Sequence, residues 1–304
     1  MTASSLWKRA IRRKSVWFSV VVLVMFGSIA ALAPWLAPYD PYKGSLTAAN
    51  KTLPPMWDDN PFKPGNAAFP LGTDFYGRDV LSRLIYGTRT AVFLALAAVP
   101  LAALIGSLVG LVSAYKGGRL DAAFMLLSDT VQSLPGIMIV VVIVLIFRSI
   151  FSPSWLHGLI TLIFGFVAVS WVSLARLIRV NVLMMKAKVF VEAAVALGAS
   201  PWEVITRHLL PNVLHVITVW VINNVPAVIL IEALLGYIGV GVTSAVDGGE
   251  FTVVSWGGMF FAGRSAMSRN PLMLIIPSLS ILLISMSFIL LADFLNDEFH
   301  KANE

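Results

Sequence analysis

The sequence predicts an all-α, polytopic membrane protein with six transmembrane helices, and three observations indicate this. Of its 304 residues, 58% are hydrophobic and 12% are charged, about half the charged share of ordinary soluble domains. Several apolar runs are long enough to cross a bilayer. The net charge is +6, and the Lys and Arg residues lie beside these runs. Basic residues in such positions orient a membrane protein in the bilayer. A nucleic-acid-binding protein would instead need a contiguous basic surface.

The number of spans follows from the thickness of the bilayer. A hydrocarbon core of about 30 Å needs roughly 20 helical residues. Five charge-free runs meet this length, at 15–39, 90–115, 149–175, 208–231 and 270–292. A sixth run at 121–147 contains Asp129, but the part after this residue is charge-free and rich in Val and Ile. We therefore predict six helices.

The first apolar run follows a basic leader, residues 1–15, and resembles a signal peptide as well as an anchor. Ala31-Leu32-Ala33 imitates a cleavage site, but the apolar length favours an uncleaved helix at 16–36. The distribution of Lys and Arg among the connections favours a cytoplasmic N-terminus and a cytoplasmic C-terminus. We expect a multi-pass protein of the cytoplasmic (cell) membrane, with a cytoplasmic tail at 294–304.

The segment 37–89 is too rich in Pro, Asn and Asp to span, and it predicts an extracytoplasmic insertion. Near its end, Gly72-Thr73-Asp74 indicates a turn that can cap a helix. Asp79 and Arg83 are then spaced for an i,i+4 ion pair on a short amphipathic helix. The remaining core, residues 90–293, is expected to hold the other five transmembrane helices.

The sequence lacks the residues or motifs that several kinds of chemistry require. The chain has no cysteine, which excludes thiol nucleophiles and Cys-ligated metals. Its four histidines lack paired spacing such as H-x-x-x-H, and neither a P-loop nor a G-x-S-x-G nucleophile elbow occurs. We therefore expect no metal site, no bound cofactor and no enzymatic activity of the chain itself.

The segment between the fourth and fifth spans predicts a helix, a sharp bend and a second helix. Residues 191–197 are strong helix formers, and Gly198 is suited to ending the helix. Ser200-Pro201-Trp202-Glu203 restarts it with a capping box, and Leu210-Pro211-Asn212 predicts another break. Such a segment can be a lever moved by a partner or an amphipathic connector lying on lipid headgroups.

The same segment resembles the EAA loop of ABC importer permeases. Glu192-Ala193-Ala194 is followed at the expected spacing by Gly198 and by His208-Leu209-Leu210-Pro211. The resemblance implies the transmembrane domain of a type I ABC importer, with a cytoplasmic coupling loop at 180–211 that seats on an ATPase subunit. It assigns this contact to a set of loop residues: Glu192, Ala193, Ala194, Leu197, Gly198, Ala199, Ser200, Pro201, Leu210 and Pro211.

Three further stretches resemble the C-type permease subunit of the dipeptide, oligopeptide and nickel importers. These are the residues 71–89, the turn from Lys116 to Asp129, and the residues 232–259. The resemblance implies a heterodimer with a B-type permease, two ATP-binding subunits that carry ATP and Mg, an extracytoplasmic substrate-binding protein and surrounding membrane lipid. It implies peptides as substrates, with nickel complexes, oligosaccharides or glutathione-like compounds as alternatives.

Two acidic residues within spans are candidates for a functional role, because an ionisable group in the membrane is costly. Asp129 is expected near the inner surface, where pairing with Arg119 or a neighbouring subunit would explain it as well as a substrate role. Glu232 is expected near the outer end of the fifth span, either solvated or facing the translocation path. An ion-coupled secondary transporter is a more distant alternative, although no inverted repeat is evident, and a membrane scaffold is another.

Overall fold

The computed structural model describes residues 13–44, 50–59, 61–150, 155–241 and 253–303. Most of the predicted leader therefore lies outside the described residues. In chain order the described elements are α2 (Lys14–Leu36), α3 (Val80–Lys116), α4 (Gly118–Gln132), α5 (Gly136–Ile150), α6 (Trp155–Lys186), α7 (Val189–Ala196), α8 (Pro201–Glu203), the π-helical turn η2 (Val204–Leu209), α9 (Leu210–Tyr237), α10 (Trp256–Ala266) and α11 (Leu272–Asn303).

Five of these helices are long and apolar enough to cross a membrane, which confirms the predicted class. They are α2, α3, α6, the continuous helix formed by α8, η2 and α9, and α11. The predicted third span is different, because it consists of α4 and α5, which meet at an angle of 87°. Pro135 lies in the break between them, where a proline disfavours helix geometry in the preceding residue. Counting this bent pair as one span gives six.

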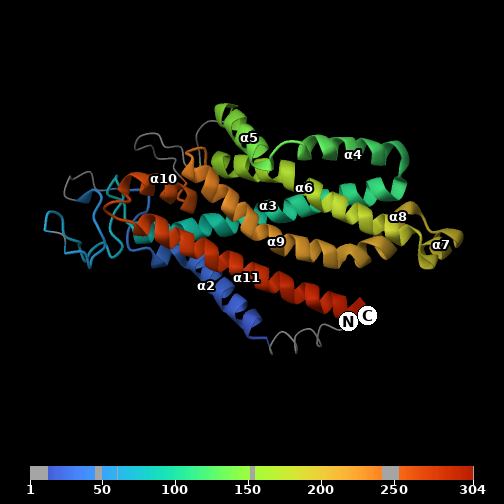
Figure 1. Ribbon diagram of the computed structural model, residues 1–304, viewed down its shortest axis with the longest axis horizontal. Coiled ribbons are helices and arrows are strands. Elements are labelled where there is room, and N and C mark those ends of the chain that lie inside the picture. The colour runs from blue at the N-terminus through green and yellow to red at the C-terminus, as the bar shows by residue number, and fades with distance from the viewer. Residues whose placement is uncertain (1–12, 45–49, 60, 151–154, 242–252, 304) are drawn as a thin grey trace.

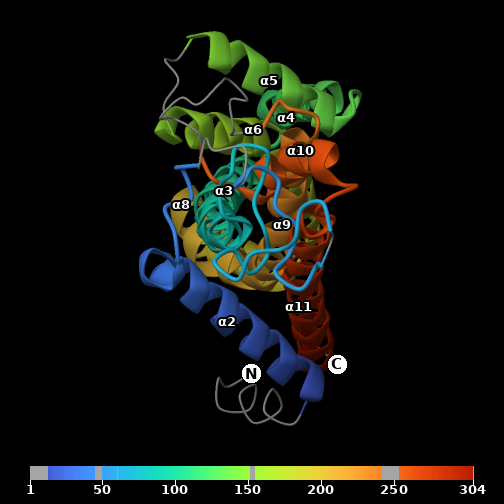
Figure 2. The ribbon, with the colours of Figure 1, turned by 90° about the vertical axis from the view of Figure 1, so that its left-hand side faces the viewer.

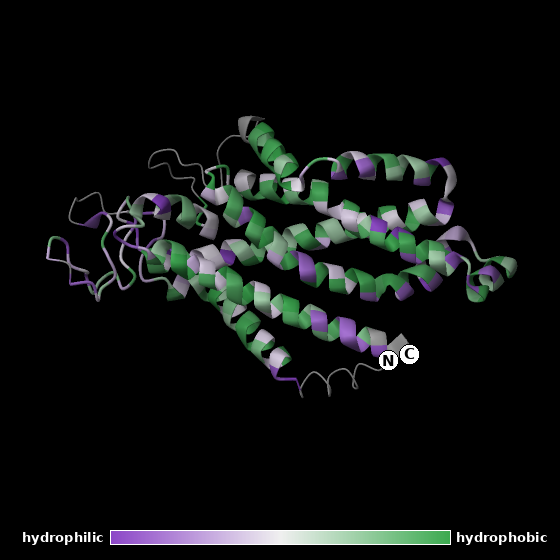
Figure 3. Cartoon of the chain, in the orientation of Figure 1, coloured by the Kyte–Doolittle hydropathy of each residue, from purple (hydrophilic) through white to green (hydrophobic). Residues whose placement is uncertain are grey.

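The long helices run side by side along one axis (Figure 1), and hydrophobic residues cover their middle portions (Figure 3). One end of the bundle carries α10 and the described parts of the 37–79 segment, which are 37–44, 50–59 and 61–79, and the opposite end carries α7 and α8. Seen along the axis, α2 and α5 lie on opposite sides of the bundle (Figure 2). Hydrophilic residues are concentrated at the two ends (Figure 3), as a membrane-spanning orientation requires.

The centre of the bundle is a close contact between α3 and α6. Gly106 and Gly110 form a G-x-x-x-G pattern on α3, and a Cβ atom at either position would lie 2.7 Å from a carbonyl oxygen of α6. Leu174 and Ile178 of α6 pack there and are fully buried. Small residues at such spacing let helix backbones approach closely in membranes. This contact therefore depends on the two glycines, which have no side chains to keep the helices apart.

The predicted ion pair between Asp79 and Arg83 is wrong. Asp79 instead caps α3, because its Oδ2 accepts hydrogen bonds from the backbone N–H of Ser82 at 2.8 Å and from the Ser82 hydroxyl at 2.6 Å. Arg83 lies 3.7 Å from Asp74 and donates to the carbonyl of Pro41. The predicted short helix is likewise the first part of α3, which begins at Val80 and continues into the span.

Residues 50–79, where described, α10 and Asn270 form what we call the outer platform, a name that anticipates the orientation proposed under Proposed function. The Asn270 side chain is fully buried and donates to the carbonyls of Leu53 and Leu71. The indole of Trp256 donates to the carbonyl of Leu84 in α3. Bonds between distant parts of the sequence therefore fix this end of the bundle.

Candidate functional site

The candidate site is the segment between α6 and α9, which we call the helix–bend–helix loop. Two residues after α6 ends, α7 begins, and it ends before Gly198, whose φ is +88°. This left-handed conformation favours glycine. Ser200 then caps α8: its Oγ accepts from the backbone N–H of Glu203, while the Glu203 carboxylate accepts from the backbone N–H of Ser200. The predicted bend and capping box are confirmed.

The predicted break at Leu210-Pro211-Asn212 is wrong. Leu209 and Leu210 both have right-handed helical dihedral angles, and Pro211 lies in the first turn of α9. The π-helical turn η2 directly precedes this proline, and the N–H of Leu210 donates to the carbonyl of Ile205, five residues back. Such a local π adjustment lets a helix continue through a proline. As a result, α8, η2 and α9 form one helix from Pro201 to Tyr237. The end of the loop is continuous with the fifth span.

The concave side of the loop borders an open hollow of about 590 Å³, which we call the loop cavity. It is lined by Phe190, Ala193, Ala194, Leu197, Gly198, Ala199, Glu203, Arg207 and His208. Five of the residues predicted from the EAA resemblance therefore line one hollow. The other five predicted residues lie outside this lining: Glu192, Ser200 and Pro201 are exposed, Pro211 is exposed on α9, and Leu210 is half-buried.

Large apolar side chains of the loop point away from the bundle. Leu197 is 89% exposed and Val189 is 80% exposed, whereas Val191 is buried and holds α7 against the protein. Trp202, the second residue of α8, is also exposed. Apolar groups gathered on such a projection indicate a contact with another molecule, and the cavity gives this contact a concave surface.

Asp129 does not pair with the predicted Arg119. Its Oδ1 instead accepts a hydrogen bond of 2.5 Å from Nη2 of Arg176, which lies on α6. The neighbouring Ser128 hydroxyl accepts from Nε of the same arginine at 3.1 Å. The predicted explanation by pairing is thus correct in kind, but the partner lies 47 residues away in the sequence.

Glu232 is not solvated, because its residue is only 2% exposed. Its Oε2 accepts from the backbone N–H of Gly257 at 3.3 Å, where α10 begins. The start of a helix offers unpaired N–H groups and a partial positive charge, which stabilise a carboxylate. Directly beside this bond, Gly236 of α9 touches Gly257 backbone to backbone, since a Cβ atom at Gly236 would lie 2.2 Å from Cα of Gly257.

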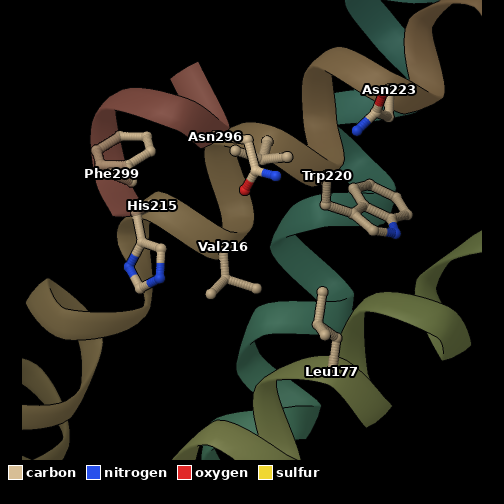
Figure 4. A pocket seen from close by; sticks show the side chains of 8 residues that line it. Leu177, His215, Val216, Trp220, Asn223, Asn296 and Phe299 are labelled. Carbon is tan, nitrogen blue, oxygen red and sulfur yellow. The ribbon is translucent and has the colours of Figure 1, made fainter. Parts of the chain in front are cut away.

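A second cavity, of about 310 Å³, lies between α6, α9 and α11 (Figure 4). Its lining consists of Leu177, His215, Val216, Val219, Trp220, Asn223, Asn296 and Phe299. The sequence analysis did not identify this group. The available signal was His215 and Asn223, two of the few polar residues of this span, but helix periodicity alone does not bring Asn296 of α11 beside them. Within the described residues, no three His, Asp or Glu side chains gather where they could hold a metal ion.

Five apolar spans, a bent sixth span and a capped loop at one end of the bundle define a polytopic membrane protein of the permease type. Residues 82–302 match the family described as binding-protein-dependent transport system inner membrane component. Residues 3–55 match the N-terminal transmembrane domain of oligopeptide transport permease C. The chain therefore belongs to the binding-protein-dependent family of ABC importer permeases.

Curated relatives are similar along nearly the whole chain. The oligopeptide transport system permease protein OppC of Bacillus subtilis is 30% identical over 297 residues, covering 96% of this chain and 88% of the relative. The dipeptide transport system permease protein DppC of Bacillus subtilis is 31% identical, covering 96% and 83%. The glutathione transport system permease protein GsiD of Pectobacterium atrosepticum is 29% identical, covering 96% and 88%.

Proposed function

We propose that this chain forms half of the translocation path of an ABC importer that carries di- or oligopeptides across the cytoplasmic membrane. ATP hydrolysis on separate subunits drives the import. The names of similar permeases, which include oligopeptide and dipeptide transport proteins, support the peptide substrate. The other half of the path is a B-type permease, and an extracytoplasmic binding protein delivers the peptide.

The helix–bend–helix loop is the observation that carries this proposal. It projects from one end of the bundle (Figure 1), exposes Leu197 and Val189, and continues through α8 into the fifth span. A partner that seats in the loop cavity and moves α8 would move α9 with it, because the helix has no break between them. The loop therefore converts a movement of docked ATPase subunits into a movement of spans.

This role implies the orientation of the chain. The ATPase subunits are cytoplasmic, so the end with α7 and α8 is the inner end, and both chain termini are cytoplasmic. The outer platform then faces the binding protein. Glu192 and Pro201 are exposed at the inner end and contact the ATPase together with the cavity residues.

The two acids within spans have structural roles in this proposal. Asp129 is exposed, with 64% of its side chain accessible, and it holds α4 to α6 through Arg176. Glu232 is buried and holds α10 to α9 through Gly257. An ion pair accounts for the first carboxylate and a backbone hydrogen bond for the second, so neither is needed as a substrate ligand. Substrate selection therefore rests on other residues and on the binding protein.

Uptake by reconstituted proteoliposomes tests the function. The chain is purified with the ATPase, permease and binding-protein subunits that its own cells supply, and labelled dipeptide, tetrapeptide, glutathione and nickel–histidine complex are offered with internal ATP. We expect ATP-dependent uptake of one or both peptides. Uptake that needs an ion gradient and no ATPase subunit would establish a secondary transporter, and uptake of only glutathione or nickel would replace the peptide assignment.

Replacing Gly198 tests the loop itself. A Cβ atom at this position meets no other atom of the chain within 4 Å, so within the chain the substitution acts through the backbone, whose φ of +88° a β-branched residue resists. Gly198 also lines the loop cavity, so the control must add a side chain there without this strain. We expect Gly198→Val to lower peptide uptake at least about tenfold, since a strained left-handed residue costs roughly 1–2 kcal/mol, with normal insertion in the membrane. Gly198→Asn is the matched control, because Asn tolerates this conformation. Equal uptake by both variants and the native chain would exclude the coupling role.

A further inference from the structure

The helix α4 is a short rigid segment between two breaks. At its start, Gly117 and Gly118 have φ values of +68° and +58°, which leave the α3–α4 turn free of side-chain restraint. At its end, Ser133 to Pro135 form the 87° bend to α5. A segment bounded in this way can rotate as a rigid body. Its position therefore depends on the contacts that its side chains make with neighbouring helices.

Apolar packing holds α4 only weakly. Phe124 and Ser128 are its buried residues, and Phe124 lies against Trp171 of α6 at a ring-centre distance of 6.1 Å. Leu126 and Leu127, by contrast, are 71% and 50% exposed. One buried aromatic ring leaves the direction of α4 poorly defined, so its polar contacts contribute to fixing its position.

Two arginines of α6 supply those polar contacts. Arg179 donates from Nε and Nη2 to the two carboxylate oxygens of Asp121, at 2.5 and 2.6 Å. Arg176 donates to Ser128 and Asp129. Asp121, Phe124 and Ser128 are spaced at i, i+3 and i+7, which places them on one face of α4. The Asp121–Arg179 pair is the better shielded, with side-chain exposures of 18% and 22%.

The same arginines lie near the helix–bend–helix loop. Seven residues after Arg179, Lys186 ends α6 and donates from Nζ to the carbonyl of Tyr115 in the last turn of α3, at 2.8 Å. The next helix, α7, begins at Val189. Any displacement of α7 thus reaches α6 within two residues, and α6 carries the groups that hold α4.

We propose that the Asp121–Arg179 and Asp129–Arg176 pairs, the α4–α6 strap, make α4 follow α6 when the helix–bend–helix loop is displaced. The four residues are positioning residues for transport. This inference rests on the proposed function, because docked ATPase subunits supply the displacement. The bidentate, charge-assisted bonds between Arg179 and Asp121 suit this role, since they fix the direction of α4 as well as its distance.

Spin labels measure the strap directly, because the chain has no native cysteine. Leu127→Cys on α4 and Val180→Cys on α6 place labels at half-exposed positions. In the reconstituted complex we expect the label distance to be the same in the resting and the ATP-trapped states. With Arg176→Gln and Arg179→Gln added, we expect the distance distribution to broaden and to differ between the two states.

Transport provides the second readout, with charge reversal as the rescue. Arg179→Gln is expected to lower peptide uptake about tenfold, as loss of a charge-assisted hydrogen bond allows, while the bound subunits still hydrolyse ATP. Asp121→Arg combined with Arg179→Asp restores the pair and should recover most of the uptake. Asp297→Asn is the matched control, because it removes an exposed ion pair with Arg13 that does not involve α4, and it should leave uptake unchanged.

The outcomes separate the strap from the function on which it rests. If the native chain binds no ATPase subunit, both the proposed function and the proposed role of the strap are excluded. If native uptake is ATP-driven but Arg179→Gln is equally active, the strap alone is overturned. The strap is also overturned if uptake by the charge-reversed variant is as low as uptake by Arg179→Gln. It is equally overturned if the distance between the spin labels does not change when both arginines are replaced.

Discussion

The hydrogen bonds that hold the two ends of the bundle differ greatly in the sequence separation of their partners. At the inner end, Ser200 and Glu203 cap α8 across three residues. At the outer end, Asn270 binds the carbonyl of Leu71 across 199 residues, and Trp256 binds that of Leu84 across 172. The outer platform is therefore fixed by the tertiary fold, whereas the helix–bend–helix loop is largely shaped by its own sequence. A loop of this kind keeps its form while a partner moves it.

Burial separates the anchoring residues of the outer platform from the tip of the loop. Trp256 and Met259, through which α10 packs on the bundle, are at most 1% exposed, although Phe62 on the surface of the platform is 97% exposed. Leu197 and Val189 of the loop are at least 80% exposed. Apolar surface of this kind is stabilised only when another molecule covers it. The comparison therefore predicts that substitutions at the outer end unfold the protein, whereas substitutions in the loop impair partner binding and leave the fold intact.

The largest effect is expected from Gly236→Val. Its Cβ atom would lie 2.2 Å from Cα of Gly257, against backbone atoms that cannot move independently. Overpacking typically costs about 1–3 kcal/mol and occasionally more, and a clash of a side chain with backbone belongs at the upper end of this range. We therefore expect little folded protein in the membrane and a large loss of thermal stability in detergent. Gly27→Val in α2 is the control, since a Cβ there meets nothing within 4 Å. Native yield and melting temperature of Gly236→Val would contradict the predicted rigidity of the outer end.

A smaller effect is expected from Arg83→Met at the base of the outer platform. Arg83 is 2% exposed, lies 3.7 Å from the fully buried Asp74 and donates to Pro41. Removing one partner of a buried pair typically costs about 3–5 kcal/mol. We expect about 2–3 kcal/mol here, because Arg78 still pairs with Asp74 at 2.7 Å. The measurement is thermal unfolding in detergent.

The inner-end counterpart of this substitution is Arg207→Met. Arg207 is 74% exposed at its side chain and pairs with Glu203 four residues earlier. An exposed pair of this kind contributes less than about 0.5 kcal/mol, so the melting temperature should not change measurably. Equal destabilisation by the two arginine substitutions would remove the distinction between the ends.

The features that the sequence predicted correctly depend on neighbours within a few residues. The apolar runs, the left-handed Gly198 and the capping box of Ser200 and Glu203 all belong to this class. Each needs only the helix repeat or one backbone angle, so it can be recognised without the rest of the fold. The predicted bend of the loop and most of the spans were correct for this reason.

The features that the sequence did not predict depend on a choice between partners. Asp79 had Arg83 at i+4, but the unpaired N–H groups at the start of α3 compete for the same carboxylate, and Asp79 caps them. Asp129 had Arg119 nearby but binds Arg176 from another helix. The cavity beside His215 likewise requires α11 to approach α9. Such choices follow from the packing of the helices, which no local pattern contains.

The most local effect is expected from Ser200→Ala, which tests the inner end most directly. The substitution removes the acceptor for the Glu203 N–H and the hydroxyl that binds the Glu203 carboxylate. Loss of an N-cap costs about 1 kcal/mol, and here it should fray only the start of α8. We expect an unchanged melting temperature, faster hydrogen exchange at the Glu203 amide and ATPase binding weakened about fivefold, as 1 kcal/mol allows.

Ser200→Thr is the matched control for this substitution, because threonine also caps helices. It should bind the ATPase subunits almost as well as the native chain. If Ser200→Ala instead lowers the melting temperature as much as Arg83→Met, the capping box supports the whole bundle, and the loop is not the locally folded lever described above. If only hydrogen exchange and ATPase binding change, the hydrogen bonds of the loop are needed for partner binding, whereas those of the outer platform stabilise the fold.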